Sequence, residues 1–328
     1  MRKVSFRAEQ WPLHEPFIIA SLPVMHFGEV VVVEISENGV CGRGECEHTN
    51  VYDVGYADVM AQLESVRSAL EQGADRTALQ QLLPPGSARN AVDCALWDLQ
   101  ARQSQQPVWQ LAGLEAAPQP LTTVFTLSLH TPQHMAAVAA ANAHRPLLKL
   151  KLGQPGDVER VAAVRAAAPG CRLVIDANMG WSAAQYLAYQ PQLAALGVEM
   201  IEQPFAPGED QLLAEVERLI PVTADESCQD RRDLAGLVGR YDLVNIKLDK
   251  AGGLTEALAL ARQARAQGFD IMVGCNVGTS LAMAPALLLA QGARYVDIDG
   301  PLLLSEDRPD AMRYQDSQAY PADRALWG

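Results

Sequence analysis

Five charged residues recur at intervals of 22 to 26 residues through the middle of this 328-residue chain. They are Lys151, Asp176, Glu202, Asp225 and Lys247, and each stands at or near the end of a short apolar run. A single carboxylate in such a place is more often a helix cap, and a single lysine is usually a solvated charge. Three carboxylates on neighbouring elements repel one another unless a cation lies among them. The complete set therefore predicts a cation site with a lysine on either side.

The three carboxylates, Asp176, Glu202 and Asp225, are the predicted metal ligands. Oxygen ligands without histidine or cysteine suit Mg²⁺, with Mn²⁺ as the alternative, rather than zinc. A divalent ion at a substrate carboxylate stabilises the charge that develops when the adjacent carbon loses a proton. Lys151 and Lys247 are the predicted acid and base. Bases on opposite faces of one carbon permit racemisation or epimerisation, whereas one base with a passive cation permits only elimination or cyclisation.

Other polar residues lie within two positions of this set. Lys149 is expected on the same side of its strand as Lys151, about 6–7 Å away, where its charge would lower the Lys151 pKa towards the working range. The alternative is that Lys149 is a simple charge at the rim. Asn178, Glu226 and Asp249 are predicted to orient the lysines and the metal ligands.

Eight short apolar runs, each followed by a helix-like stretch, position these residues. The runs cover residues 122–129, 147–152, 173–177, 200–203, 222–224, 243–248, 271–273 and 295–298. Repeating strand–helix units imply parallel strands with right-handed crossovers, and eight such units imply a closed (β/α)8 barrel. The active site of such a barrel lies at the carboxyl ends of its strands, where the charged residues fall. The predicted fold class is therefore α/β.

A different pattern precedes the barrel. Residues 30–35 and 40–46 predict a hairpin that turns at Asn38-Gly39, and residues 57–72 and 88–105 have the apolar spacing of helices. We expect an N-terminal α+β capping domain over residues 1–115, a catalytic barrel over residues 116–304, and a polar C-terminal segment over residues 305–328 that packs on the capping domain.

The composition narrows the choice of partners. A net charge of −13 disfavours nucleic acid and anionic membrane surfaces, and no apolar run approaches the length of a membrane span. The first residues lack the apolar core of a signal peptide. The six cysteines form no C-x-x-C pair, which argues against structural zinc and a disulfide framework. We expect a cytoplasmic protein with reduced thiols.

The motifs around the charged residues resemble those of the enolase superfamily, in the subgroup typified by muconate-lactonising enzymes. They are K-x-K at 149–151, D-x-N at 176–178, E-Q-P at 202–204, D-E-S at 225–227 and K-x-D at 247–249. The resemblance covers essentially the whole chain. It implies a modified TIM-like barrel with a capping domain that the C-terminal tail completes. It also implies Mg²⁺ at the three carboxylates, with Lys151 and Lys247 as acid and base on opposite faces of the substrate.

Three further segments are similar to the dipeptide epimerases of that subgroup. They are W-P-L-H-x-P-F at 11–17, A-R-N-A at 88–91 and the stretch 244–258. The pair Asp297-x-Asp299 on the last predicted strand looks like the clamp of those enzymes for the free ammonium group of a dipeptide. Physically, two adjacent carboxylates need such a cation. The resemblance implies proton transfer at the α-carbon of the C-terminal residue of a dipeptide substrate.

The loop over residues 20–29 departs from this resemblance. Family members that act on Ala-Glu carry an arginine in this loop, whereas here it contains neither arginine nor lysine. Its apolar residues favour a hydrophobic or mixed dipeptide over an anionic one. The predicted substrate contacts are Val24, Met25, His26 and Phe27 in this loop and Cys275 and Asn276 after the seventh strand. Packing is the alternative role for Cys275.

Several alternatives stay open at this point. N-acylamino acid racemases and o-succinylbenzoate synthases share the lysine pair, but their substrates carry no free ammonium group for Asp297 and Asp299. Every histidine precedes the second predicted strand, which excludes a His–Asp base late in the barrel. A barrel that binds a cation and a peptide without turnover is the alternative from another class. Relatives often assemble, so a homo-oligomer is also left open.

Overall fold

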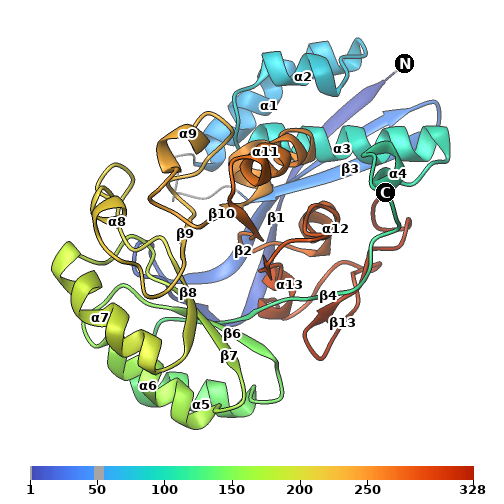
Figure 1. Ribbon diagram of the computed structural model, residues 1–328. Helices are drawn as coiled ribbons and strands as arrows, with labels where there is room; N and C mark the ends of the chain where they lie inside the picture. Colours follow the sequence, from blue (N-terminus) through green and yellow to red (C-terminus); the bar gives the residue numbers. More distant parts are fainter. Residues whose placement is uncertain (1, 48–54) are drawn as a thin grey trace.

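The computed structural model describes residues 2–47 and 55–328. Its N-terminal part is a three-stranded antiparallel sheet with helices packed on it (Figure 1). The strands are β1 (Lys3–Phe17), β2 (Met25–Glu37) and β3 (Val40–Glu47), and the helices are α1 (Tyr56–Glu71), α2 (Arg76–Leu82), α3 (Ser87–Ser104) and α4 (Val108–Leu111). β2 and β3 form the predicted hairpin, and Asn38 and Gly39 both have the positive φ that suits a tight hairpin turn.

The long strand β1 and the short helix α2 are absent from the sequence-based expectations. β1 lies at the edge of its sheet beside β2, and its Leu13 also forms an isolated antiparallel bridge with Leu304. Most of its residues are exposed or half-buried, and only Val4 and Phe17 are buried. Val4, Phe6 and Ala8 do alternate with polar residues, as in a strand, but the alternation breaks at Glu9–Gln10 and does not extend over the whole of β1.

The predicted barrel is present as an eight-stranded parallel sheet that follows chain order from β5 to β12. The backbone N–H of Val124, beside β5, donates to the carbonyl of Val296 in β12 at 2.9 Å, which brings the two ends of the sheet together. The strands are β5 (Phe125–Leu127), β6 (Leu147–Lys151), β7 (Arg172–Asp176), β8 (Val198–Glu202), β9 (Val222–Ala224), β10 (Leu243–Ile246), β11 (Asp270–Val273) and β12 (Tyr295–Val296).

Helices surround this sheet and separate its strands along the chain (Figure 1). They are α5 (Pro132–Ala141), α6 (Asp157–Ala167), α7 (Ala183–Ala195), α8 (Leu212–Glu215), α9 (Leu234–Leu237), α10 (Leu248–Ala251), α11 (Leu254–Ala266), α12 (Ser280–Leu289) and α13 (Gly300–Leu303). A small antiparallel sheet joins β4 (Leu121–Thr122) to β13 (Tyr314–Gln315) and β14 (Gln318–Ala319). None of the helices among the described residues is both long and apolar enough to cross a membrane.

The alternation of side chains along the strands divides the barrel interior into an apolar floor and a charged upper layer. The floor is a separate buried cluster of Val124, Leu147, Val174, Met200, Leu243, Met272 and Tyr295. Residues two and four positions further along a strand face the same side. Leu147 in the floor is therefore followed upward by Lys149 and Lys151, and Val174 is followed by Asp176.

The C-terminal segment packs against the capping elements. The guanidinium of Arg308 donates to Glu45 in β3 at 2.5 and 3.0 Å and to Glu9 in β1 at 2.7 Å. Further along the segment, the indole N–H of Trp327 donates to the carbonyl of Cys94 in α3 at 3.1 Å. These contacts hold the C-terminal segment against β1, β3 and α3 of the N-terminal part. All six cysteines are free thiols.

Two glycines of β3 allow α3 to lie directly on the strand. A methyl group at Gly44 would collide with the carbonyl of Ala91 and would lie 2.7 Å from the backbone nitrogen of Ala95. At Gly42, a methyl group would collide with the backbone of Ala95 and Leu99. Because these obstacles are backbone atoms of a helix, side-chain rotation cannot relieve the collision.

The substitution Gly44→Ala is therefore expected to lower the free energy of unfolding by about 1–3 kcal/mol, because overpacking moves α3 from β3. Urea unfolding followed by circular dichroism measures this change. The control is Gly170→Ala, where nothing lies within 4 Å of the added methyl group, and its effect should stay within about 0.5 kcal/mol. Equal effects of the two substitutions would contradict the close approach of α3 to β3.

Candidate active site

The strand register brings three of the predicted site residues into one row. Lys151 on β6 pairs with Asp176 on β7, and Asp176 pairs with Glu202 on β8. Asp225 follows the last residue of β9, next along the sheet. Asp176, Glu202 and Asp225 are each no more than 1% exposed. The regular sequence spacing thus becomes a buried row of carboxylates at the carboxyl ends of the strands.

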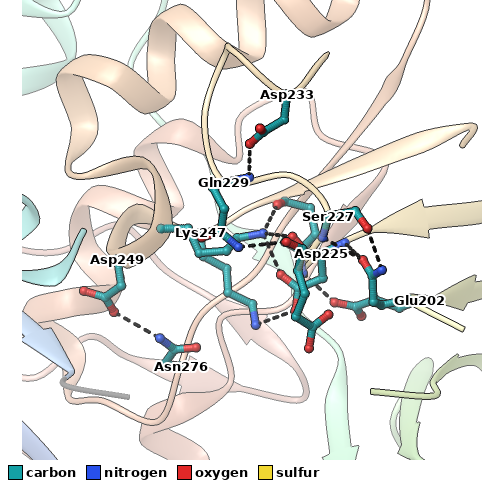
Figure 2. Close-up of polar contacts among 12 residues, drawn as sticks. Glu202, Asp225, Ser227, Gln229, Asp233, Lys247, Asp249 and Asn276 are labelled. Carbon is teal, nitrogen blue, oxygen red and sulfur yellow. Dashed lines mark hydrogen bonds and ion pairs between the residues drawn. The ribbon is translucent and has the colours of Figure 1, made fainter. Parts of the chain in front are cut away.

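The two predicted acid–base lysines contact opposite ends of this row. The Nζ atom of Lys151 lies 2.7 Å from Asp176 Oδ2. The Nζ atom of Lys247 lies 2.8 Å from Asp225 Oδ2, a contact drawn in Figure 2. Although burial acts to raise the pKa of Asp225, the ammonium groups of Lys247 and Lys250 hold it below its usual value. The same holds for Asp176, where Lys151 and Lys149 outweigh burial and lower the pKa.

Lys149 lies deeper in the barrel, among three carboxylates. Its Nζ atom is 2.6 Å from both Glu202 and Asp297, and 3.3 Å from Asp176. Burial acts to lower the Lys149 pKa, but the charges of Asp297, Glu202 and Asp176 raise it well above its usual value. Lys149 is therefore held as a permanent cation beneath the site. The predicted effect of Lys149 on Lys151 stays a prediction.

Three residues without a predicted role hold the carboxylates in place. The side-chain amide of Asn245 donates to Glu202 Oε1 at 2.7 Å, and Lys250 Nζ lies 2.6 Å from Asp225 Oδ1. The side-chain oxygen of Gln203 accepts the backbone N–H of Asp225 at 2.8 Å. Strand alternation could have placed Asn245 inside the barrel, two residues before Lys247. No sequence pattern predicts the contact of Lys250 with Asp225, because Lys250 lies in α10 and its position depends on the turn that begins that helix.

The donor set fits a hard divalent cation. Within the described residues, Glu226 Oε2 and Asn178 Oδ1 are buried without a hydrogen-bond partner. Burial, together with the charge of Asp176, raises the pKa of Glu202 to about 7, and burial with Asp225 raises that of Glu226 to about 8. A cation among these oxygens would provide the unpartnered atoms with a ligand contact and would lower the raised pKa values of Glu202 and Glu226. Among the described residues, the potential ligand atoms of Cys275, Asp297 and Asp299 also lie within 4.8 Å of one another.

A cleft above the carboxylate row is bounded by the barrel, by the β1–β2 connection and by the end of β3. The predicted residues that line it are Met25, Lys151, Asn178, Glu226, Lys247, Cys275, Asn276, Asp297 and Asp299. The lining residues that were not predicted are Phe17, Ile19, Leu22, Glu47, Thr126, Val277, Gly300 and Leu303. Most of these residues are apolar. They line the cleft only because segments distant in the sequence pack together there.

The other three residues of the predicted loop set lie outside this lining. Val24 is 49% exposed and Phe27 is 48% exposed, and His26 is also exposed. Phe27 pairs with Pro12 of β1 in the antiparallel register. The substrate contacts predicted for Val24, His26 and Phe27 stay predictions.

Asp297 and Asp299 follow β12, which ends at Val296, and line the cleft with different partners. Asp297 pairs with Lys149, whereas Asp299 Oδ2 accepts the backbone N–H of Thr126 at 2.6 Å. Burial, followed by the charge of Asp297, raises the pKa of Asp299 to about 7. An ionised Asp299 would therefore gain from a cation in the cleft.

Asp249 links the capping part of the chain to the helix that begins after Lys247. One carboxylate oxygen accepts from the side-chain amide of Asn90 on α3 at 2.7 Å, and the other faces that of Asn276 at 3.5 Å (Figure 2). Lys247 occupies the N-cap position of α10, on which Asp249 lies. Burial raises the pKa of Asp249 to about 7. The orienting roles predicted for Asp249, Glu226 and Asn178 are not tested by this geometry.

Comparison with known families covers both parts of the chain. The family described as Mandelate racemase / muconate lactonizing enzyme, N-terminal domain, matches residues 1–113. The family described as Enolase C-terminal domain-like matches residues 133–320. The chain therefore belongs to the mandelate racemase/muconate lactonising enzyme family of the enolase superfamily, as its motifs predicted.

Two named proteins are similar over nearly the whole chain. The chain is 46% identical to the L-Ala-D/L-Glu epimerase of Escherichia coli (strain K12) over 316 residues, which cover 96% of this chain and 98% of that protein. It is 42% identical to the N-acetyl-D-glutamate racemase of a Pseudoalteromonas species, over 91% of this chain and 95% of that protein.

Solved structures with bound dipeptides share the fold. An enolase family member from Agrobacterium tumefaciens with homology to dipeptide epimerases contains sodium and L-Ala-L-Glu, and it matches with a TM-score of 0.98 and 45% identity over 100% of both chains. A dipeptide epimerase from Cytophaga hutchinsonii, complexed with Mg and D-Ala-L-Val, matches with a TM-score of 0.91 and 25% identity. That match covers 99% of this chain and 94% of the other.

The metal fit predicts a measurable stabilisation by Mg²⁺. At a Mg²⁺ concentration 100 times the dissociation constant, the free energy of unfolding should rise by about 2.7 kcal/mol. The substitution Glu202→Gln removes the charge of one predicted ligand and should abolish this gain. The control Asp270→Asn removes a carboxylate whose side chain is 55% exposed and should keep it. Thermal unfolding with and without Mg²⁺ measures the difference, and an unchanged gain in Glu202→Gln would contradict the site.

Proposed function

We propose that this protein is an isomerase that epimerises a dipeptide at the α-carbon of its C-terminal residue. The observation that carries the proposal is the position of Lys151 and Lys247 at opposite ends of a buried carboxylate row. A proton removed by one lysine is returned by the other from the opposite face, which inverts the carbon. The names of the relatives, which are epimerases and a racemase, support this reaction class.

We assign Mg²⁺ as the metal, with Mn²⁺ as the alternative, and Asp176, Glu202 and Asp225 as the residues that would hold it. The bound ion would neutralise the negative charge that the substrate carboxylate gains when the adjacent C–H bond breaks. The unpartnered buried oxygens and the Mg-containing neighbour structure support this assignment. Lys149 remains protonated and adds a fixed positive charge beneath the site.

Asp299 favours a dipeptide over an N-acylated amino acid. The free ammonium group of a dipeptide would pair with Asp299, while Asp297 already pairs with Lys149. An acylated nitrogen carries no positive charge and would leave Asp299 without a cation. The N-acylamino acid racemase remains the second candidate, because one relative at 42% identity has the name N-acetyl-D-glutamate racemase.

The cleft wall favours an uncharged or mixed side chain over glutamate. Phe17, Ile19, Leu22 and Met25 form part of the lining and belong to one apolar cluster or pack against it. The loop over residues 20–29 contains neither arginine nor lysine. We therefore propose a hydrophobic or mixed dipeptide as substrate, although two of the similar proteins are associated with Ala-Glu.

Two further properties belong to this proposal. The six free cysteines are consistent with a reducing compartment, and we propose a cytoplasmic location. The homo-oligomer left open by the sequence stays a prediction.

Proton exchange in D₂O tests the two-lysine mechanism. The protein should introduce deuterium at the C-terminal α-carbon of both L,L- and L,D-dipeptides. Lys151→Ala and Lys247→Ala should each lower epimerisation by about 10²–10⁴-fold, and each should still exchange one epimer, opposite in the two variants. Mass spectrometry and NMR give both rates. The control is Lys3→Ala, which removes an exposed lysine, and normal epimerisation by Lys151→Ala would refute the assignment.

The role of Asp299 predicts a preference for free dipeptides. The kcat/KM value for a dipeptide should exceed that for the same dipeptide with an acetylated N-terminus by about 10-fold or more. Asp299→Asn keeps an oxygen for the Thr126 N–H and should reduce this ratio towards one by lowering only the dipeptide value. If the acetylated substrate is preferred by the unaltered protein, the racemase alternative replaces the epimerase.

A further inference from the structure

Glu47 is a buried carboxyl group in the cleft that the proposed reaction does not use. It is the last residue of β3, where it pairs with Val30 of β2. Its exposed fraction is 8%, and it lines the cleft together with Lys247 and the apolar wall. The described residues provide its side chain with neither a hydrogen bond nor an ion pair. Such a group costs free energy unless something in the cleft compensates it.

The charges around Glu47 do not stabilise its ionised form. Burial, then the charge of Asp249 and that of Glu29, raise its pKa well above the usual value, and Lys247 opposes them only in part. Lys247 already lies 2.8 Å from Asp225. An additional cation at the end of β3 would therefore stabilise the ionised carboxylate of Glu47.

The position of Glu47 indicates which part of a substrate would supply this cation. Asp299 is assigned to the N-terminal ammonium group, and the reacting α-carbon lies between Lys151 and Lys247. Glu47 and Lys247 also line a second, smaller cavity together, so Glu47 lies on the Lys247 side of the cleft. The side chain of the C-terminal residue leaves the reacting carbon and is the part that can reach it.

We propose that Glu47 selects dipeptides whose C-terminal residue is lysine or arginine, by pairing with the side-chain cation. This inference rests on the proposed epimerase function and names its substrate class. The apolar wall of Phe17, Leu22 and Met25 would cover the methylene stem, while the charged end reaches Glu47. The substrate is thus mixed in character, with an aliphatic stem and a cationic end. Its charge is opposite to that of the glutamate side chain in Ala-Glu.

A pair of matched substrates tests this inference. L-Ala-L-lysine and L-Ala-L-norleucine have the same four side-chain carbons and differ by the ammonium group. The kcat/KM value for α-proton exchange in D₂O should be about 10- to 100-fold higher for the lysine peptide. L-Ala-L-glutamine and L-Ala-L-glutamate complete the panel, because a protonated Glu47 would instead donate a hydrogen bond to either of them.

Two variants connect the preference to Glu47. Glu47→Gln keeps the size of the side chain and should lower the lysine-to-norleucine ratio by about tenfold or more, with norleucine exchange unchanged within about twofold. Glu47→Lys should reverse the preference towards L-Ala-L-glutamate. The control Glu34→Gln removes a carboxylate from the middle of β2, outside the cleft, and should preserve the ratio.

The outcomes separate this inference from the function on which it rests. Exchange of L-Ala-L-norleucine without any preference for lysine would overturn the role of Glu47 and leave the epimerase intact. A lysine preference that persists in Glu47→Gln would overturn it as well, and so would a higher rate with the glutamine or glutamate peptide. Absence of exchange with every dipeptide would overturn the epimerase function and this inference together.

Discussion

Opposite charges buried together are the constraint on which this site depends. Asp176, Glu202 and Asp225 are almost completely excluded from solvent, and isolated carboxylates would not remain ionised there. Lys149, Lys151, Lys247 and Lys250 lie at 2.6 to 2.8 Å from these oxygens or from Asp297. Replacing one member leaves the others with unbalanced charge, so the group behaves as a unit. A metal ion among the oxygens would release Lys151 and Lys247 towards the substrate.

The rest of the barrel keeps this charged layer in place. An apolar floor fills the interior below it, and the parallel register aligns Lys151, Asp176 and Glu202 across three strands. The capping elements act on the other side, because Asn90 contacts Asp249 and the guanidinium of Arg89 donates to the carbonyls of Ala251 and Gly252. The short helix that begins after Lys247 is therefore fixed by a part of the chain about 160 positions away.

The cleft lies where the capping elements meet the barrel. The predicted catalytic groups come from strand ends, whereas Phe17, Leu22, Met25 and Glu47 come from the N-terminal sheet and its β1–β2 connection. This separation allows the substrate side chain to vary while the lysine pair stays unchanged. It also explains why similarity to an Ala-Glu epimerase does not by itself define the substrate of this chain.

Elements and residues that follow a local period could be read from the amino-acid order alone. The eight strand–helix units, the β2–β3 hairpin and the recurring charged residues could be predicted, because side-chain alternation and strand-end position are local properties. Contacts between segments that are distant in the sequence depend on the tertiary structure and leave no local pattern. β1 pairs at the edge of its sheet, and Lys250 reaches Asp225 through the turn into α10. Met25 joins the cleft lining, whereas Val24 and Phe27 lie outside it. The position of Glu47 beside Lys247 likewise depends on the packing of two separate parts of the chain, which no spacing in the sequence records.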